Sequence, residues 1–278
     1  MRTLWQKRWR LVGSAVVLCL SMFISLGVAL WQHTDVLDAL TTGEVNWTTG
    51  VVQSRGWASP SARDKAISQQ EQTVYMHATQ AARQRLLETI AQLRYDTTQT
   101  VAKVLQQTER QRRLEALVAE AEVIQTRYGE RGTVESTVQL ALFGPVTALL
   151  LPELSAPVAE AEPASDGVYT GIVIDARGLA LQAALFPRLV DEQAQPVYDL
   201  MHVDADFAVR RGYIAYASTA TEAQARSRVG EHPLLVRARR VAGEERVDLV
   251  LRQSDAMQLQ GHDETRQLLR QCRVLILR

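Results

Sequence analysis

The chain has 278 residues, 46% of them hydrophobic, and its 31 Lys and Arg residues balance its 31 Asp and Glu residues. A dedicated nucleic-acid-binding protein normally carries a strong positive excess, so a formal net charge of zero argues against that class. The length and the ordinary hydrophobic content suit two globular domains of about 100–125 residues, each large enough to bury a core.

An uncharged apolar segment, residues 11–30 from Leu11 to Leu30, lies close to the N-terminus. As a helix rising about 1.5 Å per residue it would be about 30 Å long, which matches the hydrocarbon core of a bilayer. Several basic residues and no acidic residue precede it, a bias that favours a cytoplasmic N-terminus (Arg2, Lys7, Arg8 and Arg10). We therefore expect residues 1–42 to anchor the protein in a membrane, with everything after Trp31 on the far side from the cytoplasm.

A cleaved signal peptide is the alternative, because Gly27-Val28-Ala29 matches a small-x-small cleavage site. Cleavage would place the protein in the periplasm or at the outer membrane. The apolar segment is longer than a usual signal core, and tryptophans flank it as they flank membrane-spanning helices (Trp5, Trp9 and Trp31). Both interpretations export everything that follows.

Residues 43–150 predict an α+β domain. The segment 43–57 has the composition of a strand that is interrupted near Gly50. Two helices should follow, a long amphipathic one that reaches residue 93 and a second over 101–118 with a polar middle that faces water or a partner helix. Segments 122–128 and 133–142 should form a hairpin around 129–132. In the first helix, apolar residues recur at intervals of four and three residues and so form a stripe along one face (Val74, Ala78, Ala82, Leu86, Ile90 and Leu93).

A Pro/Ala/Glu-rich linker is predicted over residues 151–166, and a C-terminal mixed α/β domain over 167–278. Strands 234–239 and 247–251 should pair across the turn 242–245. The other predicted strands are 169–177, two short ones within 188–198, 213–217 and 274–277, and the predicted helices are 206–211, 221–226 and 264–269. The whole fold is predicted as α+β: a membrane helix and two small domains, each with helices packed on a short mixed or antiparallel sheet.

The early strand with Trp47, the Ala-rich segment 79–90 and the hairpin ending at 138–144 together resemble the LPP-type domain of bacterial envelope lipoproteins. The flagellar accessory proteins FlgP and FlgT carry that domain. The resemblance covers residues 43–144 and implies a non-enzymatic envelope protein that assembles with its own copies or with a cell-surface machine. Cys19 lacks the small preceding residue of lipidated members, which departs from their pattern. The segment 169–198 resembles a segment of uncharacterised exported bacterial proteins and implies no activity.

No motif for a serine nucleophile, a dinucleotide, a phosphate-cradling loop or a zinc protease occurs, so we expect no catalytic residue, metal or cofactor. Cys272, in an apolar run, should be a buried small hydrophobic residue. If the segment 202–206 is a strand, its alternate residues would place three potential metal ligands on one face (His202, Asp204 and Asp206). The two aspartates could instead cap the helix that follows.

Four residues are candidates for binding a ligand: Asp175, Arg177, Arg237 and Arg239. Arg177 follows a strand end and could hold a carboxylate bidentately, or it could close a turn by pairing locally with Asp175. Arg237 and Arg239 should share a strand face beside Arg240, where they could contact an anionic polymer or protect a sheet edge.

These observations leave three functions open. The first is a non-enzymatic structural protein that self-assembles or scaffolds a surface apparatus such as flagellum-associated machinery; its partners would be its own copies and envelope or flagellar proteins. The second is a periplasmic module that recognises peptidoglycan or another anionic glycan through Asp175 and Arg177. A third, a hydrolase, would need a pocket that joins Asp175, His202 and Asp204.

Overall fold

A computed structural model describes residues 35–60, 67–106, 108–152, 168–219 and 227–278. The predicted membrane segment 11–30, most of the linker and the predicted helix 221–226 lie outside these residues. None of the helices in the described ranges has the length and apolar character needed to cross a bilayer. The described residues combine helices with both antiparallel and parallel sheets, so the predicted α+β class is confirmed.

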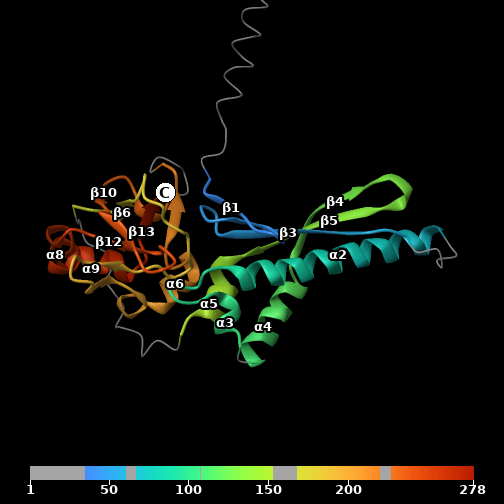
Figure 1. Cartoon of the computed structure of the whole chain (residues 1–278), viewed down its shortest axis with the longest axis horizontal. Helices are drawn as coiled ribbons and strands as arrows, with labels where there is room; N and C mark the ends of the chain where they lie inside the picture. Colours follow the sequence, from blue (N-terminus) through green and yellow to red (C-terminus); the bar gives the residue numbers. More distant parts are fainter. Residues whose placement is uncertain (1–34, 61–66, 107, 153–167, 220–226) are drawn as a thin grey trace, which may run out of the picture. The chain divides into compact units, whose positions relative to one another are not determined.

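A five-stranded antiparallel sheet occupies the N-terminal half (Figure 1). The predicted interruption near Gly50 is a tight turn with a positive φ of 68° at Gly50, so the segment 43–57 forms two paired strands. The predicted hairpin is confirmed, with the short 3₁₀ turn η1 (Glu130–Gly132) at its tip. The strand order is β1 (Leu37–Ala39), β2 (Glu44–Asn46), β3 (Val51–Ala58), β5 (Val134–Ala141) and β4 (Glu122–Tyr128).

The long helix α2 (Ile67–Gln92) covers one face of this sheet (Figure 1). Every residue of its predicted apolar stripe is buried, none more than 3% exposed. Apolar side chains every three or four residues place this stripe on a single helix face, which packs on β3 and β5.

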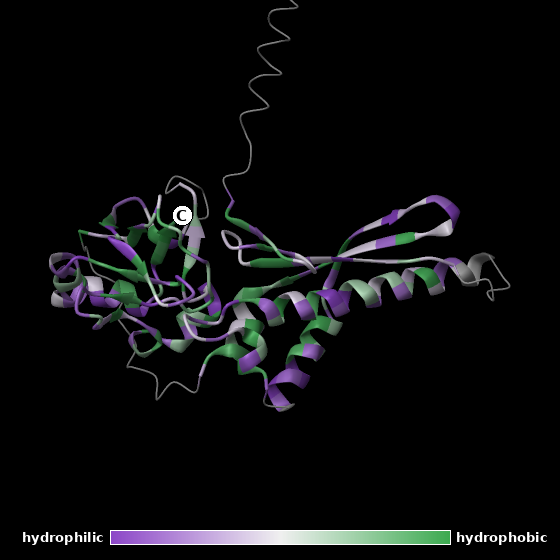
Figure 2. Ribbon diagram, in the orientation of Figure 1, coloured by the Kyte–Doolittle hydropathy of each residue, from purple (hydrophilic) through white to green (hydrophobic). Residues whose placement is uncertain are grey.

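The single helix predicted over 101–118 is wrong, because the chain forms α3 (Val101–Val104) and α4 (Thr108–Ala119) instead. No apolar residue occurs between Leu105 and Leu114, so no continuous stripe holds one straight helix against the core. Most of the polar residues between them are exposed, and Figure 2 shows hydrophilic residues along this end of α4. The short helices η2 (Leu142–Val146) and α5 (Thr147–Leu150) follow β5.

The C-terminal half contains two four-stranded sheets where one was predicted, and the first is parallel throughout, not mixed or antiparallel. Its two central strands are buried along nearly their whole length, as continuous apolar runs in parallel sheets are. The closing strand is found as predicted. The order is β10 (Pro233–Arg237), β6 (Gly171–Asp175), β13 (Val274–Leu277) and β9 (Ala215–Ala217).

A second, mixed sheet has the order β11 (Arg240–Ala242), β12 (Asp248–Val250), β7 (Leu189–Val190) and β8 (Pro196–Tyr198). The predicted pairing of 234–239 with 247–251 is therefore wrong. Leu234 and Val236 are buried where β10 lies beside β6. The residues that pair with β12 are Arg240–Ala242, next to the turn at Gly243, and the backbone N–H of Arg239 donates to the Val250 carbonyl at 2.8 Å. The helical elements of this half include η3 (Leu200–His202), α6 (Ala205–Arg211), α8 (Gln253–Gly261), which was not predicted, and α9 (Asp263–Arg270).

One hydrophobic cluster contains buried residues from both predicted domains, and residues 35–278 form one compact unit. The ring centroids of Trp47 and Tyr216 lie 5.6 Å apart, and those of Tyr95 and Phe186 lie 4.8 Å apart. The Tyr95 hydroxyl also donates to the Leu150 carbonyl at 3.1 Å. Because the core is shared, the domain boundaries at 43–150, 151–166 and 167–278 stay predictions.

Candidate anion-binding site

The carboxyl edge of the parallel sheet brings together residues that are far apart in the sequence. Asp175 is the last residue of β6, and in the β6–β10 register it lies opposite Arg237, the last residue of β10. Arg177 follows two residues after β6, before Gly178, whose φ is 81°. Because neighbouring parallel strands end at the same edge, this register explains why three of the four predicted residues are neighbours.

Asp175 and Arg177 form the local ion pair that the sequence offered as the alternative to a ligand site. The Arg177 Nε and Nη2 donate to the two carboxylate oxygens at 2.9 and 2.8 Å, and the backbone N–H of Arg177 donates at 3.1 Å. These hydrogen bonds from Arg177 are the main reason that the pKa of Asp175 falls from 3.8 to about 2. The carboxylate therefore closes the turn, while the Arg177 side chain stays 54% exposed.

Four arginines line one surface hollow of about 250 Å³, which we call the arginine hollow (Arg177, Arg237, Arg239 and Arg252, with Leu179 and Ala238). Arg239 lies beyond the end of β10, so it does not share a strand face with Arg237 as predicted, but both residues line the hollow. Asp175 does not line the hollow but pairs with Arg177 at its edge.

Arg252 is the member of the hollow that sequence reasoning missed. It directly precedes α8, a helix that was not predicted, and it follows β12, whose partner was predicted wrongly. No motif marks it, so only the correct pairing of the strands could have placed it beside the other arginines.

The charges of the arginine hollow are only partly balanced. Asp175 pairs with Arg177, and Glu192 pairs with Arg239 at 2.8 Å. In the described part of the chain, Arg237 and Arg252 form no ion pair with an acidic side chain. Guanidinium groups present planar pairs of N–H donors that match carboxylate and phosphate oxygens, so this surface is suited to a ligand with negative groups.

Of the two interpretations of His202, Asp204 and Asp206, the structure shows a helix cap at Asp204 and no shared strand face. His202 ends η3, and its Nδ1 lies 2.7 Å from an Asp199 oxygen, whereas Asp204 accepts a hydrogen bond from the Asp206 N–H at 2.8 Å and caps α6. The capping aspartate starts a helix at this point, which removes the alternation that a strand would give. Among the residues described, no three His, Cys, Asp or Glu side chains are grouped as a metal site.

A pocket of about 300 Å³ contains His202 and Asp204 together with Phe207 and Leu269. Asp175 does not line it, so the structure does not bring together the three residues that the hydrolase hypothesis needed.

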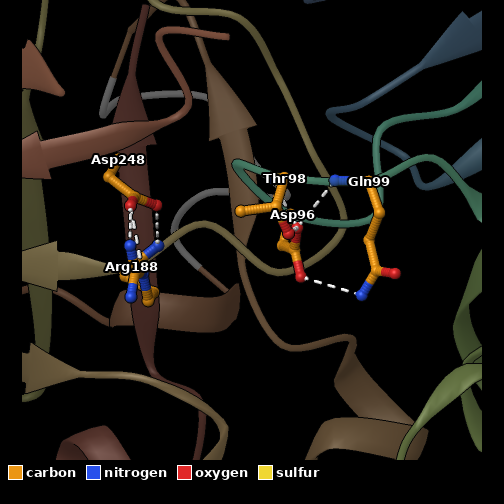
Figure 3. A network of polar contacts seen from close by, with 5 residues as sticks. All are labelled: Asp96, Thr98, Gln99, Arg188 and Asp248. Carbon is orange, nitrogen blue, oxygen red and sulfur yellow. Dashed lines mark hydrogen bonds and ion pairs between the residues drawn. The ribbon is translucent and has the colours of Figure 1, made fainter. Parts of the chain in front are cut away.

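Figure 3 shows a second polar cluster, which consists of two separate groups of residues. Each hydrogen bond drawn there joins residues of the same group. The Asp96 carboxylate accepts from the backbone N–H groups of Thr98 and Gln99 at 2.7 and 3.0 Å, which fixes the turn after α2. Arg188 and Asp248 form a separate ion pair, in which the Nε and Nη2 of Arg188 donate to one carboxylate oxygen and its backbone N–H donates to the other. These hydrogen bonds hold loops in place. The cluster contains one arginine, which is already paired with Asp248, so it is less suited to binding an anion than the arginine hollow.

The fold and this site define an α+β protein with an arginine-lined surface hollow at the edge of a parallel sheet. Residues 171–278 match the family model described as the second domain of Treponema pallidum Tp0624. The matched residues include all four strands of the parallel sheet and all four arginines of the hollow. Among curated proteins, none matches the chain.

Proposed function

We propose that this protein is a non-enzymatic component of the bacterial envelope that binds an anionic polymer, peptidoglycan or another anionic glycan, at the arginine hollow. The membrane segment 11–30 would anchor it in the inner membrane, with the α+β unit of residues 35–278 in the periplasm. The observation that carries the proposal is the convergence of four arginines against two acidic partners.

The geometry suits a repeating polymer better than one small solute. The hollow is open to solvent, and individual exposed ion pairs contribute only about 0–1 kcal/mol each. A polymer with regularly spaced carboxylates engages several arginines at once, and later contacts then form within the same complex. Binding of this kind weakens as salt screens the exposed charges.

Co-sedimentation of the full-length protein in detergent with purified cell wall tests the proposal. The double variant Arg177→Gln/Arg237→Gln should lose at least about tenfold in affinity, since it removes charge-assisted hydrogen bonds from the hollow. The matched control is Arg112→Gln/Arg131→Gln, which removes two exposed charges elsewhere and should sediment like the parent. Equal sedimentation of both double variants, or binding to cell wall with amidated carboxylates, would contradict the proposal.

Self-assembly is a second candidate function, and the edge of the antiparallel sheet favours it. β4 is the last strand of that sheet, and it exposes Ile124 by 40% and Tyr128 by 71%. An unpaired strand edge with exposed apolar side chains can add a strand from another molecule. The resemblance to the LPP-type domain, with its flagellar or other surface partners, supports the same proposal.

Mass measurement of the detergent-solubilised full chain tests self-assembly. Ile124→Lys/Tyr128→Lys should shift an oligomer toward the monomer, whereas Met257→Lys, at a residue 64% exposed on α8, should not. A parent protein that is a monomer at all concentrations would exclude this candidate.

A further inference from the structure

A buried guanidinium lies near the end of α6, away from the residues of the arginine hollow. Arg228 is only 8% exposed. Its Nη1 donates to the carbonyls of Gly212 and Cys272 at 3.1 and 2.8 Å, and its Nη2 donates to the carbonyl of Arg211. All three acceptors are neutral, so they satisfy hydrogen bonds but supply no full negative charge.

A second cation increases this imbalance. Arg211 is the last residue of α6, and its Nη1 is buried without a hydrogen-bond partner in the described structure. Throughout the described ranges, no acidic side chain forms an ion pair with Arg211 or Arg228. Burial lowers the pKa of Arg228 from 12.5 to about 10, and the charge of Arg211 acts in the same direction.

Burying two neighbouring cations destabilises the folded protein unless a negative charge compensates them. A buried cation loses its hydration, and a second cation nearby adds repulsion. The carbonyls at the end of α6 carry a partial negative charge, which helps one guanidinium but leaves the unpartnered Nη1 of Arg211 unexplained.

The two arginines face a common space. A hollow of about 270 Å³ is lined by Arg211 and Arg228, by hydroxyl-bearing Thr48, Thr49 and Ser227, and by apolar residues that include Phe143. The Phe143 ring centroid lies 5.7 Å from the Arg228 guanidinium carbon. Apolar walls reduce the competition from water, which strengthens an interaction between the arginines and an anion.

We infer that this hollow binds one small oxyanion, a carboxylate or phosphate group, between Arg211 and Arg228. The guanidinium of Arg211, which lines the hollow, would donate to the anion, and the charge of Arg228 would stabilise it. Thr48 and Thr49 belong to the turn between β2 and β3, so the bound anion would link that turn to the end of α6. This inference is independent of the polymer proposed for the arginine hollow.

Calorimetric titration of the full-length protein with inorganic phosphate tests the inference. The titration uses the Arg177→Gln/Arg237→Gln background to weaken binding at the arginine hollow, and sodium chloride holds the ionic strength constant. Adding Arg211→Gln should weaken phosphate binding by at least about tenfold, the loss expected for one charge-assisted hydrogen bond. A parallel titration with acetate distinguishes a carboxylate ligand from a phosphate ligand.

Arg210→Gln is the matched control. Arg210 lies on the same helix and over the same Phe207 ring as Arg211, at 5.1 Å compared with 5.6 Å, but it is exposed and does not line the hollow. Thr49→Val, which keeps both cations, provides a second variant if Arg211→Gln does not fold. Binding of neither anion, or equal affinity of the Arg211→Gln and Arg210→Gln proteins, would overturn the inference. Loss of cell-wall binding alone would affect only the proposed polymer site.

Discussion

The carboxylate of Asp248 accepts three hydrogen bonds from Arg188 (Figure 3). The backbone N–H of Arg188 donates at 3.0 Å, and its guanidinium donates through Nε and Nη2 at 3.0 and 2.6 Å. Asp248 begins β12, and Arg188 directly precedes β7, so the pair fixes two neighbouring parallel strands against each other. The Asp248 side chain is 3% exposed, whereas that of Arg188 is 50% exposed.

Asp248→Asn should therefore lower the free energy of unfolding by about 2 kcal/mol. The amide oxygen still accepts the backbone N–H, but the charge that balances Arg188 is lost. Because Arg188 can reach water, the loss should be smaller than for a fully buried pair. Urea unfolding measures the change, and Asp263→Asn is the control, since the Asp263 side chain that pairs with Arg266 is 94% exposed. The control should change stability by less than about 0.5 kcal/mol, and equal effects of the two variants would contradict the assignment.

Asp175 should titrate with a pKa of about 2 in the folded protein, because Arg177 donates hydrogen bonds to its charged form. A pKa that is lowered on folding adds stability above the unfolded pKa of about 4, and that stability is lost as the pH falls toward 2. Carbon NMR of the carboxyl group across this range measures the pKa directly. Arg177→Gln should raise the midpoint toward 3.8, whereas Arg252→Gln should leave it nearly unchanged. An unshifted midpoint in Arg177→Gln would show that the pair does not form in solution.

Local periodicity predicted the parts of the fold that depend on neighbouring residues. The apolar stripe of α2 and the hairpin of β4 and β5 follow directly from side-chain spacing. Strand pairing depends instead on which distant segment completes the core. Pairing of β10 with β6 joins residues about sixty positions apart, and no local pattern distinguishes it from pairing with β12.

The residues of the candidate site divide in the same way, into those that a local pattern identifies and those that only long-range packing brings together. Asp175 and Arg177 were recognisable because the pair lies within three residues at a strand end. Arg252 joins the hollow only through long-range packing, and the buried pair Arg211 and Arg228 depends on where α6 ends. Their sequence context is that of ordinary surface arginines, so no spacing could have identified them.

Cys272 should be chemically inert in the folded protein. Its side chain is fully buried, and burial raises the pKa of its thiol to about 11, so almost no reactive thiolate forms near neutral pH. In a Cys19→Ser variant, a thiol reagent such as DTNB should react with Cys272 only after unfolding in urea. Reaction of the native protein within minutes at pH 8 would show that this region opens readily.

Gly56 should be required for the contact between α2 and β3. A Cβ atom at this position would collide with the backbone nitrogen of Ala82 and the backbone oxygen of Ala78. Backbone atoms cannot rotate away as side chains do, so Gly56→Ala should lower the free energy of unfolding by about 2–3 kcal/mol. Gly261→Ala is the matched control, because nothing lies within 4 Å of a Cβ placed at that last residue of α8. Alanine also favours helix over glycine, so the control should be neutral or stabilising by about 0.5 kcal/mol in the same urea titration. If both substitutions were neutral, α2 and β3 would have to be farther apart in solution than these glycine contacts indicate.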